Sequence, residues 1–151
     1  VTGVQTCALP IFFCVVATVA AVSFDSASRV AIVAVALVLF AIGVATFLLG
    51  FFTAVQRSRE SEIAVSQLFF LAGGIAPRAA KLPMNVCLAV QTAVGVAAAI
   101  ARPSTDGKAG SVLAFGVLVP MLGLGLNGLW ASRHGQFAVR ELGGEEPEAD
   151  E

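Results

Sequence analysis

The stretch that decides the fold runs from Val30 to Val55. It reads VAIVAVALVLFAIGVATFLLGFFTAV, twenty-six residues without a charged side chain. A bilayer core of about 30 Å is crossed by about 20 apolar residues in a helix that rises about 1.5 Å per residue. A run this long and apolar does not fit the interior of a soluble domain, so residues 30–55 predict a transmembrane helix.

The composition of the whole chain agrees with a membrane protein. Of its 151 residues, 58% are hydrophobic and 13% are charged, whereas about 25% of the residues of soluble domains are charged. Six of the ten acidic residues lie within residues 141–151, so the remainder is basic, with nine Lys and Arg against four acids. We expect the lipid bilayer to surround the chain and expect no nucleic-acid partner.

The first eleven residues call for separate treatment. VTGVQTCALPI resembles, residue for residue, the conceptual translation of a common sequencing-adapter oligonucleotide. We interpret residues 1–11 as adapter-derived sequence fused to a truncated gene and leave them out of the fold prediction. The alternative is a genuine N-terminus. Cys14 and Cys87 then remain, each inside an apolar run, which favours small buried hydrophobes over redox or metal chemistry.

Further apolar segments complete an all-α, polytopic bundle over residues 12–134. Residues 12–24 predict the surviving part of a truncated first helix, and Pro83 and Pro103 bracket a third over 84–101. A fourth over 111–131 ends at Trp130, an aromatic anchor at the headgroup level. The sequence therefore predicts four transmembrane helices.

Two segments lie outside these spans. Residues 63–75 are too few to span, and they predict an interfacial or re-entrant half-helix that starts near Ser61 and Glu62. Residues 135–151 predict a disordered acidic tail on the cytoplasmic side.

The distribution of Lys and Arg predicts the orientation. With four spans, one side of the membrane carries Arg57, Arg59, Arg78, Lys81, Arg133 and Arg140, and the other carries Arg29, Arg102 and Lys108. The positive-inside rule places the richer side in the cytoplasm. We expect a multi-pass protein of a bacterial cytoplasmic (inner) membrane with both termini cytoplasmic.

Four polar residues inside the predicted spans are candidate intramembrane contacts: Thr46, Asn85, Gln91 and Asn127. One hypothesis is that they line a polar path. The other, which we favour, is that they join helices, at about 0.6 to 2 kcal/mol per contact. Pro120 has no N–H to donate to the Gly116 carbonyl, so we expect the Gln91 amide to donate there.

Other patterns have a functional and a structural interpretation. Arg57, Arg59, Arg78 and Lys81 are candidate lipid-headgroup contacts, at about 1 kcal/mol per charge, or serve topology alone. The pattern G-x-G-x-x-G at residues 123–128 lies inside an apolar helix, which favours close helix packing over a nucleotide site. Alanines 93, 97 and 101 form a similar ridge of small residues.

No Asp, Glu, Lys, Arg or His lies inside a complete span. Coupled transporters usually need an ionisable group there, so this class is disfavoured. His134 is the one histidine, and neither it nor Ser132 has partners that predict a ligand set or a triad. We predict no catalytic, cofactor-binding or metal-binding residues and favour a protein that is not an enzyme.

Three segments carry a family resemblance: RSRESEIAVSQLFFLAGGIAP, LAVQTAVGVAAAIARP and LAFGVLVPMLGLGLNGLWASRHGQF. Together they resemble a group of small, uncharacterised integral membrane proteins of actinobacterial type. The resemblance covers about 80 to 90 residues from Arg57 onward and implies a four-helix membrane protein of a bacterial inner membrane, without an activity. We expect a non-catalytic structural or accessory component, acting with a membrane protein partner or as a homo-oligomer. The alternative is an oligomeric pore or small-solute transport subunit around Gln91 and Thr46.

Overall fold

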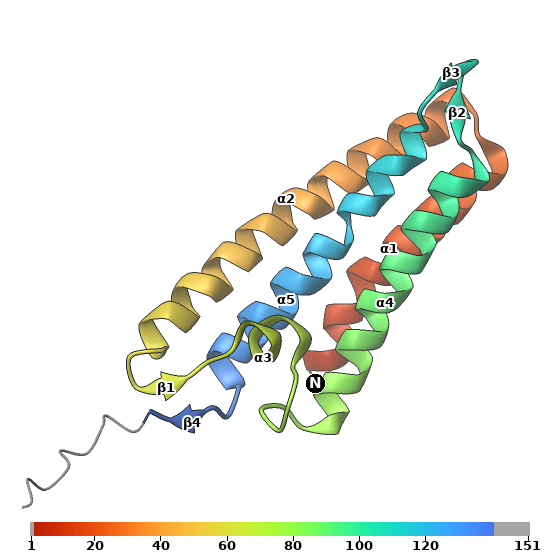
Figure 1. The fold of residues 1–151 in the computed structure, drawn as a ribbon. Helices are drawn as coiled ribbons and strands as arrows, with labels where there is room; N and C mark the ends of the chain where they lie inside the picture. Colours follow the sequence, from red (N-terminus) through yellow and green to blue (C-terminus); the bar gives the residue numbers. More distant parts are fainter. Residues whose placement is uncertain (1, 141–151) are drawn as a thin grey trace, which may run out of the picture.

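The computed structural model describes the backbone of residues 2–140 and the side chains from residue 8 to residue 140. The helical segments are α1 (Thr2–Ser23), α2 (Ser26–Arg57), α3 (Val65–Phe70), α4 (Arg78–Ala101), the 3-10 segment η1 (Val112–Leu118) and α5 (Pro120–His134). Two short antiparallel pairs join β1 (Ser61–Glu62) to β4 (Ala138–Val139) and β2 (Ser104–Thr105) to β3 (Lys108–Ala109). The long helices lie alongside one another in an up-and-down bundle (Figure 1).

Helix length and composition confirm the predicted all-α membrane class. Within the described residues, three segments are long and apolar enough to cross a membrane: Ser26–Arg57, Arg78–Ala101 and Val112–His134. Ala8–Ser23 is a shorter apolar helix. The 32 residues of α2 extend about 48 Å at about 1.5 Å per residue, so this helix is longer than a hydrocarbon core of about 30 Å.

The first helix begins at Thr2 rather than near residue 12. The residues before Phe12 carry no charge, and the one proline among them, Pro10, lies inside the helix. An uncharged segment continues an apolar helix without placing a charge in lipid. Because this conformation does not depend on where the segment comes from, the adapter origin of residues 1–11 stays a prediction.

Two predicted helix starts differ from the structure. The predicted helix over 30–55 begins earlier, at Ser26, with Asp25 as its N-cap, because the Asp25 side-chain oxygen accepts from the Ser28 N–H over 3.2 Å. The predicted helix over 84–101 begins earlier, at Arg78, with Pro77 as its N-cap and Pro83 inside it. The alanines and the lysine between Pro77 and Pro83 favour helix, so α4 starts directly after Pro77.

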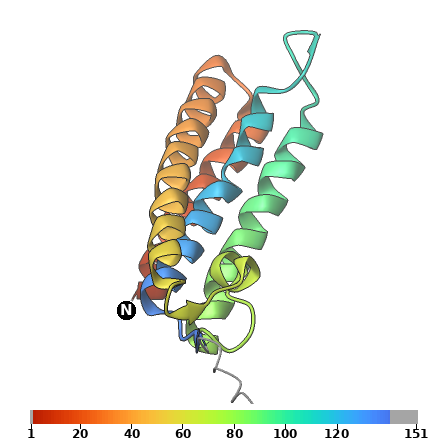
Figure 2. The same ribbon diagram turned by 60° about the vertical axis from the view of Figure 1, so that its left-hand side comes forward.

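Glycines bring α2 and α5 into backbone contact. A Cβ added at Gly50 would lie 2.7 Å from the carbonyl carbon of Gly128, and one added at Gly43 would lie 2.7 Å from the carbonyl carbon of Met121. The two helices lie side by side in both views (Figure 1, Figure 2). Small residues allow this approach in lipid, which confirms close packing as the use of the glycine pattern over 123–128.

The predicted fourth helix over 111–131 consists of two segments, η1 and α5. Pro120 has no N–H and cannot make the α-helical bond to the Gly116 carbonyl. Val119 N–H donates to that carbonyl instead, over 3.2 Å. The 3-10 register bonds each carbonyl to the third residue onward, so it satisfies Gly116 without a donor at Pro120.

One end of the bundle carries the loop between α1 and α2 and the loop between α4 and η1, and polar side chains at these loops contact each other. Here Arg29 forms an ion pair with Asp106, with nitrogen and oxygen 2.7 Å apart. Asp106 and Gly107 both have positive φ, at 52° and 75°, which is the backbone of a tight turn between β2 and β3. Arg29 and Lys108 thus lie at the end that the sequence predicts to be poor in basic residues.

The opposite end carries β1 and β4. Ser61 and Glu62, predicted as a helix start, form β1 and pair with Val139 and Ala138. The backbone groups of the two segments satisfy one another, which is why neither is a free loop. The prediction of a disordered tail is therefore wrong for residues 138 and 139, whereas residues 141–151 lie outside the described residues.

Candidate functional site

The short helix α3 packs against α5 near the β1–β4 end of the bundle (Figure 1). The Phe69 ring stacks on the Phe47 ring, with centroids 4.4 Å apart. Phe47 precedes the last residue of α2, Arg57, by ten positions, or about 15 Å along the helix. Leu71 at the tip is fully buried and has a positive φ of 52°, which turns the chain back. The helix α3 is therefore shorter than the predicted half-helix over 63–75. Its interfacial or re-entrant position in a membrane stays a prediction.

Asn85 and Asn127 hold the inner end of α3. Asn127 donates from Nδ2 to the Phe69 carbonyl over 2.9 Å and to Asn85 Oδ1 over 3.1 Å. Asn85 donates from Nδ2 to the Phe70 carbonyl over 2.9 Å. The last carbonyls of a helix have no partner within it, and inside lipid such groups need a partner from the protein. The two amides supply these partners and join α3, α4 and α5.

The beginning of α3 is held by its own side chain. Gln67 Oε1 accepts from the Ala64 N–H over 3.1 Å, which satisfies one of the free donors at this end. Leu68 and Phe69 are buried, and the Phe69 ring fills the space beside Gly128, where a Cβ would lie 2.6 Å from the ring. The half-helix is thus fixed at both ends and along one side.

Gln91 is fully buried, and neither Nε2 nor Oε1 has a hydrogen-bond partner among residues 8–140. Its Nε2 lies beside Gly123, 3.1 Å from where a Cβ would stand. The expected bond to the Gly116 carbonyl is absent from the described residues, and that carbonyl accepts from the Val119 N–H instead. This part of the prediction is wrong for the conformation observed.

Thr46 hydrogen-bonds within its own helix. Its hydroxyl donates to the Ile42 carbonyl over 2.9 Å and the Gly43 carbonyl over 3.0 Å. A Cβ at Gly125 would overlap this hydroxyl, so Thr46 faces α5 without a side-chain partner there among the described residues. Of the four candidate intramembrane residues, the structure joins Asn85 to Asn127 and leaves Gln91 and Thr46 apart from them.

The four candidate lipid contacts separate into two groups. Arg57 donates to the carbonyls of Ser132 and Gly135 over 3.2 and 2.9 Å, and its guanidinium lies 5.2 Å from the Phe137 ring centroid. It therefore closes the end of α5. Arg59, Arg78 and Lys81 have no hydrogen bond or ion pair among the described side chains. Lys81 and Arg78 line a hollow with Leu82 and Asn85 at the start of α4.

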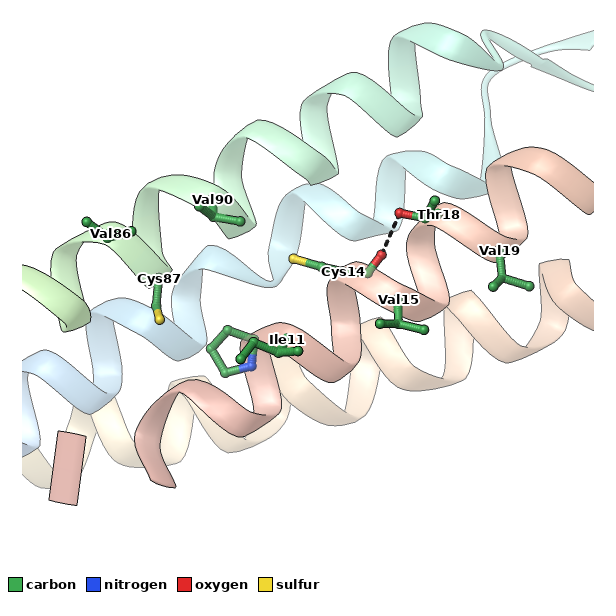
Figure 3. Close-up of a pocket in the computed structure, with 9 residues that line it drawn as sticks. Ile11, Cys14, Val15, Thr18, Val19, Val86, Cys87 and Val90 are labelled. Carbon is green, nitrogen blue, oxygen red and sulfur yellow. Dashed lines mark hydrogen bonds between the residues drawn. The ribbon is translucent and has the colours of Figure 1, made fainter. Parts of the chain in front are cut away.

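An apolar groove of about 460 Å³ lies between α1 and α4 (Figure 3). Ile11, Val15 and Val19 line it from α1, and Val86 and Val90 from α4. Cys14 has a free thiol, whereas Cys87 is disulfide-bonded, so the interpretation as a small buried hydrophobe without redox chemistry is wrong for Cys87. The Thr18 hydroxyl donates to the Cys14 carbonyl over 2.8 Å. Among the described residues, no Asp, Glu, His, Lys or Arg side chain lines the groove.

His134 and Ser132 do not approach each other as a catalytic pair. The exposed His134 stacks on Trp130 with ring centroids 5.5 Å apart, and its Nδ1 lies 3.3 Å from the Trp130 carbonyl. Buried Ser132 donates to the Leu129 carbonyl over 3.0 Å. Among the described residues, no group of three or more His, Cys, Asp or Glu side chains is placed to hold a metal ion.

Comparison with known proteins gives no match. No family model matches the chain, and no curated protein or solved structure is significantly similar to it.

The sequence prediction missed the partners of the asparagines. It named Asn85 and Asn127 but not the carbonyls of Phe69 and Phe70, because backbone acceptors leave no mark in the sequence. A signal was available, since a half-helix that ends at Gly73 and Gly74 inside lipid must find partners for its last carbonyls. Asn85 and Asn127 were the nearest amides predicted at that depth.

Proposed function

We propose that this chain is a small, non-catalytic structural or accessory component of a bacterial cytoplasmic membrane. It acts by binding another membrane helix, which belongs to a second copy or to a membrane protein partner. The resemblance to small actinobacterial-type membrane proteins supports the choice of membrane.

One observation carries the proposal. Four alanines at successive i+4 positions of α4 are all exposed: Ala89, Ala93, Ala97 and Ala101. The opposite face of the same helix is buried through Gln91, Gly95 and Ala98. Ridges of small residues drive helix association in lipid because they allow close backbone contact. The internal glycines are already used within the bundle, whereas this ridge of four small residues is a surface of the same kind that the bundle does not use.

The interior supports a structural role over a catalytic one. The described spans contain no ionisable Asp, Glu, Lys, Arg or His side chain away from their ends. The Asn85 and Asn127 amides are bonded to backbone carbonyls and to each other. These contacts fix α3 in place, as expected for a scaffold.

The orientation is part of the proposal. Arg57, Arg59 and Arg78 lie at the β1–β4 end, together with Lys81, Arg133 and Arg140. The positive-inside rule then places that end and both termini in the cytoplasm. Lys81 and Arg78 contact anionic headgroups there, while Arg57 serves the bundle itself.

Energy transfer between labelled copies in vesicles tests the association. Ala93→Leu with Ala97→Leu places two branched side chains on the ridge and should lower self-association, or capture of the partner, at least tenfold. The matched control is Ala41→Leu with Ala45→Leu, the same change at exposed positions of α2, which should leave association unchanged. Equal association of all three chains contradicts the proposed surface.

A flux assay distinguishes the alternative, an oligomeric pore or small-solute transport subunit. Its basis is the unpaired Gln91 amide, a polar group in the middle of the membrane. Vesicles containing the chain should release trapped ions and small neutral solutes no faster than protein-free vesicles. Release that rises with protein content and is lost in Gln91→Leu contradicts the accessory role and favours the pore.

A further inference from the structure

The unpaired Gln91 amide lies opposite a helical segment of unusual register. η1 runs for seven residues as a 3-10 helix, whereas such runs rarely exceed three or four. Long 3-10 stretches inside a helix mark hinges or strained segments. The fourth span therefore has a defined position, between Ser111 and Pro120, at which a second register is available.

Pro120 decides which carbonyl is satisfied in each register. In the 3-10 register, Val119 N–H donates to the Gly116 carbonyl. In an α-helical register, the donor to Gly116 would be residue 120, and proline has none. Conversion of η1 to α-helix therefore frees the Gly116 carbonyl inside the bundle, where it needs a donor from another helix.

Helix α4 faces the Gly116 carbonyl. It carries Gln91, the one buried side-chain amide that has no hydrogen-bond partner in the described part of the chain. Gly95 packs against the carbonyl, since a Cβ there would lie 2.7 Å from the Gly116 oxygen. Gln91 lies one helical turn from Gly95 on the same buried face. In the observed 3-10 register, the Gln91 amide has no hydrogen-bond partner among the described residues. In an α-helical register, the Gly116 carbonyl would have no partner unless Gln91 donated to it.

We propose that η1 is a two-state hinge and that Gln91 is its latch. In the second state η1 is α-helical and Gln91 Nε2 donates to the Gly116 carbonyl. A change in rise from about 2.0 to about 1.5 Å per residue shortens seven residues by about 3.5 Å. This shortening moves the β2–β3 turn toward the bundle, while the hydrogen bonds of Asn127 hold α5, which follows Val119, in place.

Fluorine NMR in lipid nanodiscs tests the hinge. A trifluoromethyl-phenylalanine replaces Phe115, an exposed η1 residue. The otherwise native chain should give two resonances, and Gln91→Leu should lower the second at least tenfold. Pro120→Ala, which restores the donor to Gly116, should raise the same resonance at least tenfold, also when combined with Gln91→Leu.

A control variant and the contradicting outcomes complete the test, and none of them depends on a loss of folding. Thr92→Val changes the residue next to Gln91, an exposed side chain that bonds to its own helix through the Leu88 carbonyl, and it should leave the ratio unchanged. A single resonance in the native chain overturns the hinge. Two resonances whose ratio does not respond to Gln91→Leu overturn the latch, and so does a Pro120→Ala chain with the native ratio.

Discussion

Asn127 donates one amide hydrogen to Asn85 Oδ1 over 3.1 Å and the other to the Phe69 carbonyl over 2.9 Å. Asn127 is 1% exposed, so water cannot replace either bond. One side chain of α5 thereby fixes both α4 and the inner end of the half-helix.

Asn127→Leu should destabilise the bundle by about 1 to 3 kcal/mol without preventing insertion. The change leaves the Phe69 carbonyl and Asn85 Oδ1 buried without a donor, and leucine favours the apolar span. Unfolding in mixed detergent micelles, followed by circular dichroism, measures the loss. Thr53→Val is the control, because the Thr53 hydroxyl donates only to the Leu49 carbonyl of its own helix. An equal effect of both changes would show that the asparagine contacts contribute nothing specific.

Gly50→Ala should destabilise the same bundle through contact between α2 and α5. The added methyl would lie 2.7 Å from the carbonyl carbon of Gly128, so the helices must move apart, at a cost of about 1 to 3 kcal/mol. Gly74→Ala adds the same methyl where no atom lies within 4 Å, and it should change stability little. Thermal unfolding of the two variants in one detergent gives the comparison, and equal midpoints contradict it.

The sequence predicts the spans well because their signal is summed over about twenty residues. Val30 to Val55 is apolar throughout, so no tertiary contact was needed to predict α2. Helix starts are less predictable because one polar atom decides them. Asp25 and Ser28 both cap helices well, and only the structure shows that Asp25 accepts from Ser28.

The residue types of the candidate site can be predicted from the sequence, but the hydrogen-bond partners of these residues cannot. Asn85, Gln91 and Asn127 stand out as amides within apolar helices. The partner of each depends on how α3 and η1 run, and both segments are set by backbone hydrogen bonds. The bond from Val119 to Gly116, which satisfies the carbonyl that Gln91 was expected to bond, follows from a 3-10 register that apolar periodicity does not distinguish from an α-helix.

Arg57→Ala should lower stability by about 1 to 2 kcal/mol, because the guanidinium satisfies two carbonyls at the end of α5. Arg59→Ala removes the same charge two residues later from an exposed position and is expected to be neutral. Chemical unfolding of both variants at moderate salt measures the difference. If both variants lose stability equally, Arg57 acts only through charge, as a lipid contact would.

The cap at Asp25 should make stability depend on pH. Hydrogen bonds from the Ser28 side chain and then the Ser28 backbone hold the pKa of Asp25 below its usual value. The stabilising effect is therefore complete above the unfolded-state pKa, near 3.9, and is lost as the pH falls through the lower folded-state pKa. The melting temperatures of the native chain and Asp25→Ala should differ at pH 7 and converge in acid. Asp25→Asn retains a neutral cap, so its difference from Asp25→Ala should not change with pH.

Labelling from one side of the membrane tests the proposed orientation. Ala109→Cys lies in β3 and Ala138→Cys in β4, exposed positions at opposite ends of the bundle. Since the β4 end carries more Lys and Arg, a maleimide that does not cross membranes should label Ala109→Cys in intact cells and Ala138→Cys only after permeabilisation. The native chain controls for reaction at Cys14. The reverse pattern would show that the charge bias does not set the orientation. Labelling of both positions in intact cells would contradict the single span, Val112–His134, that separates the two cysteines.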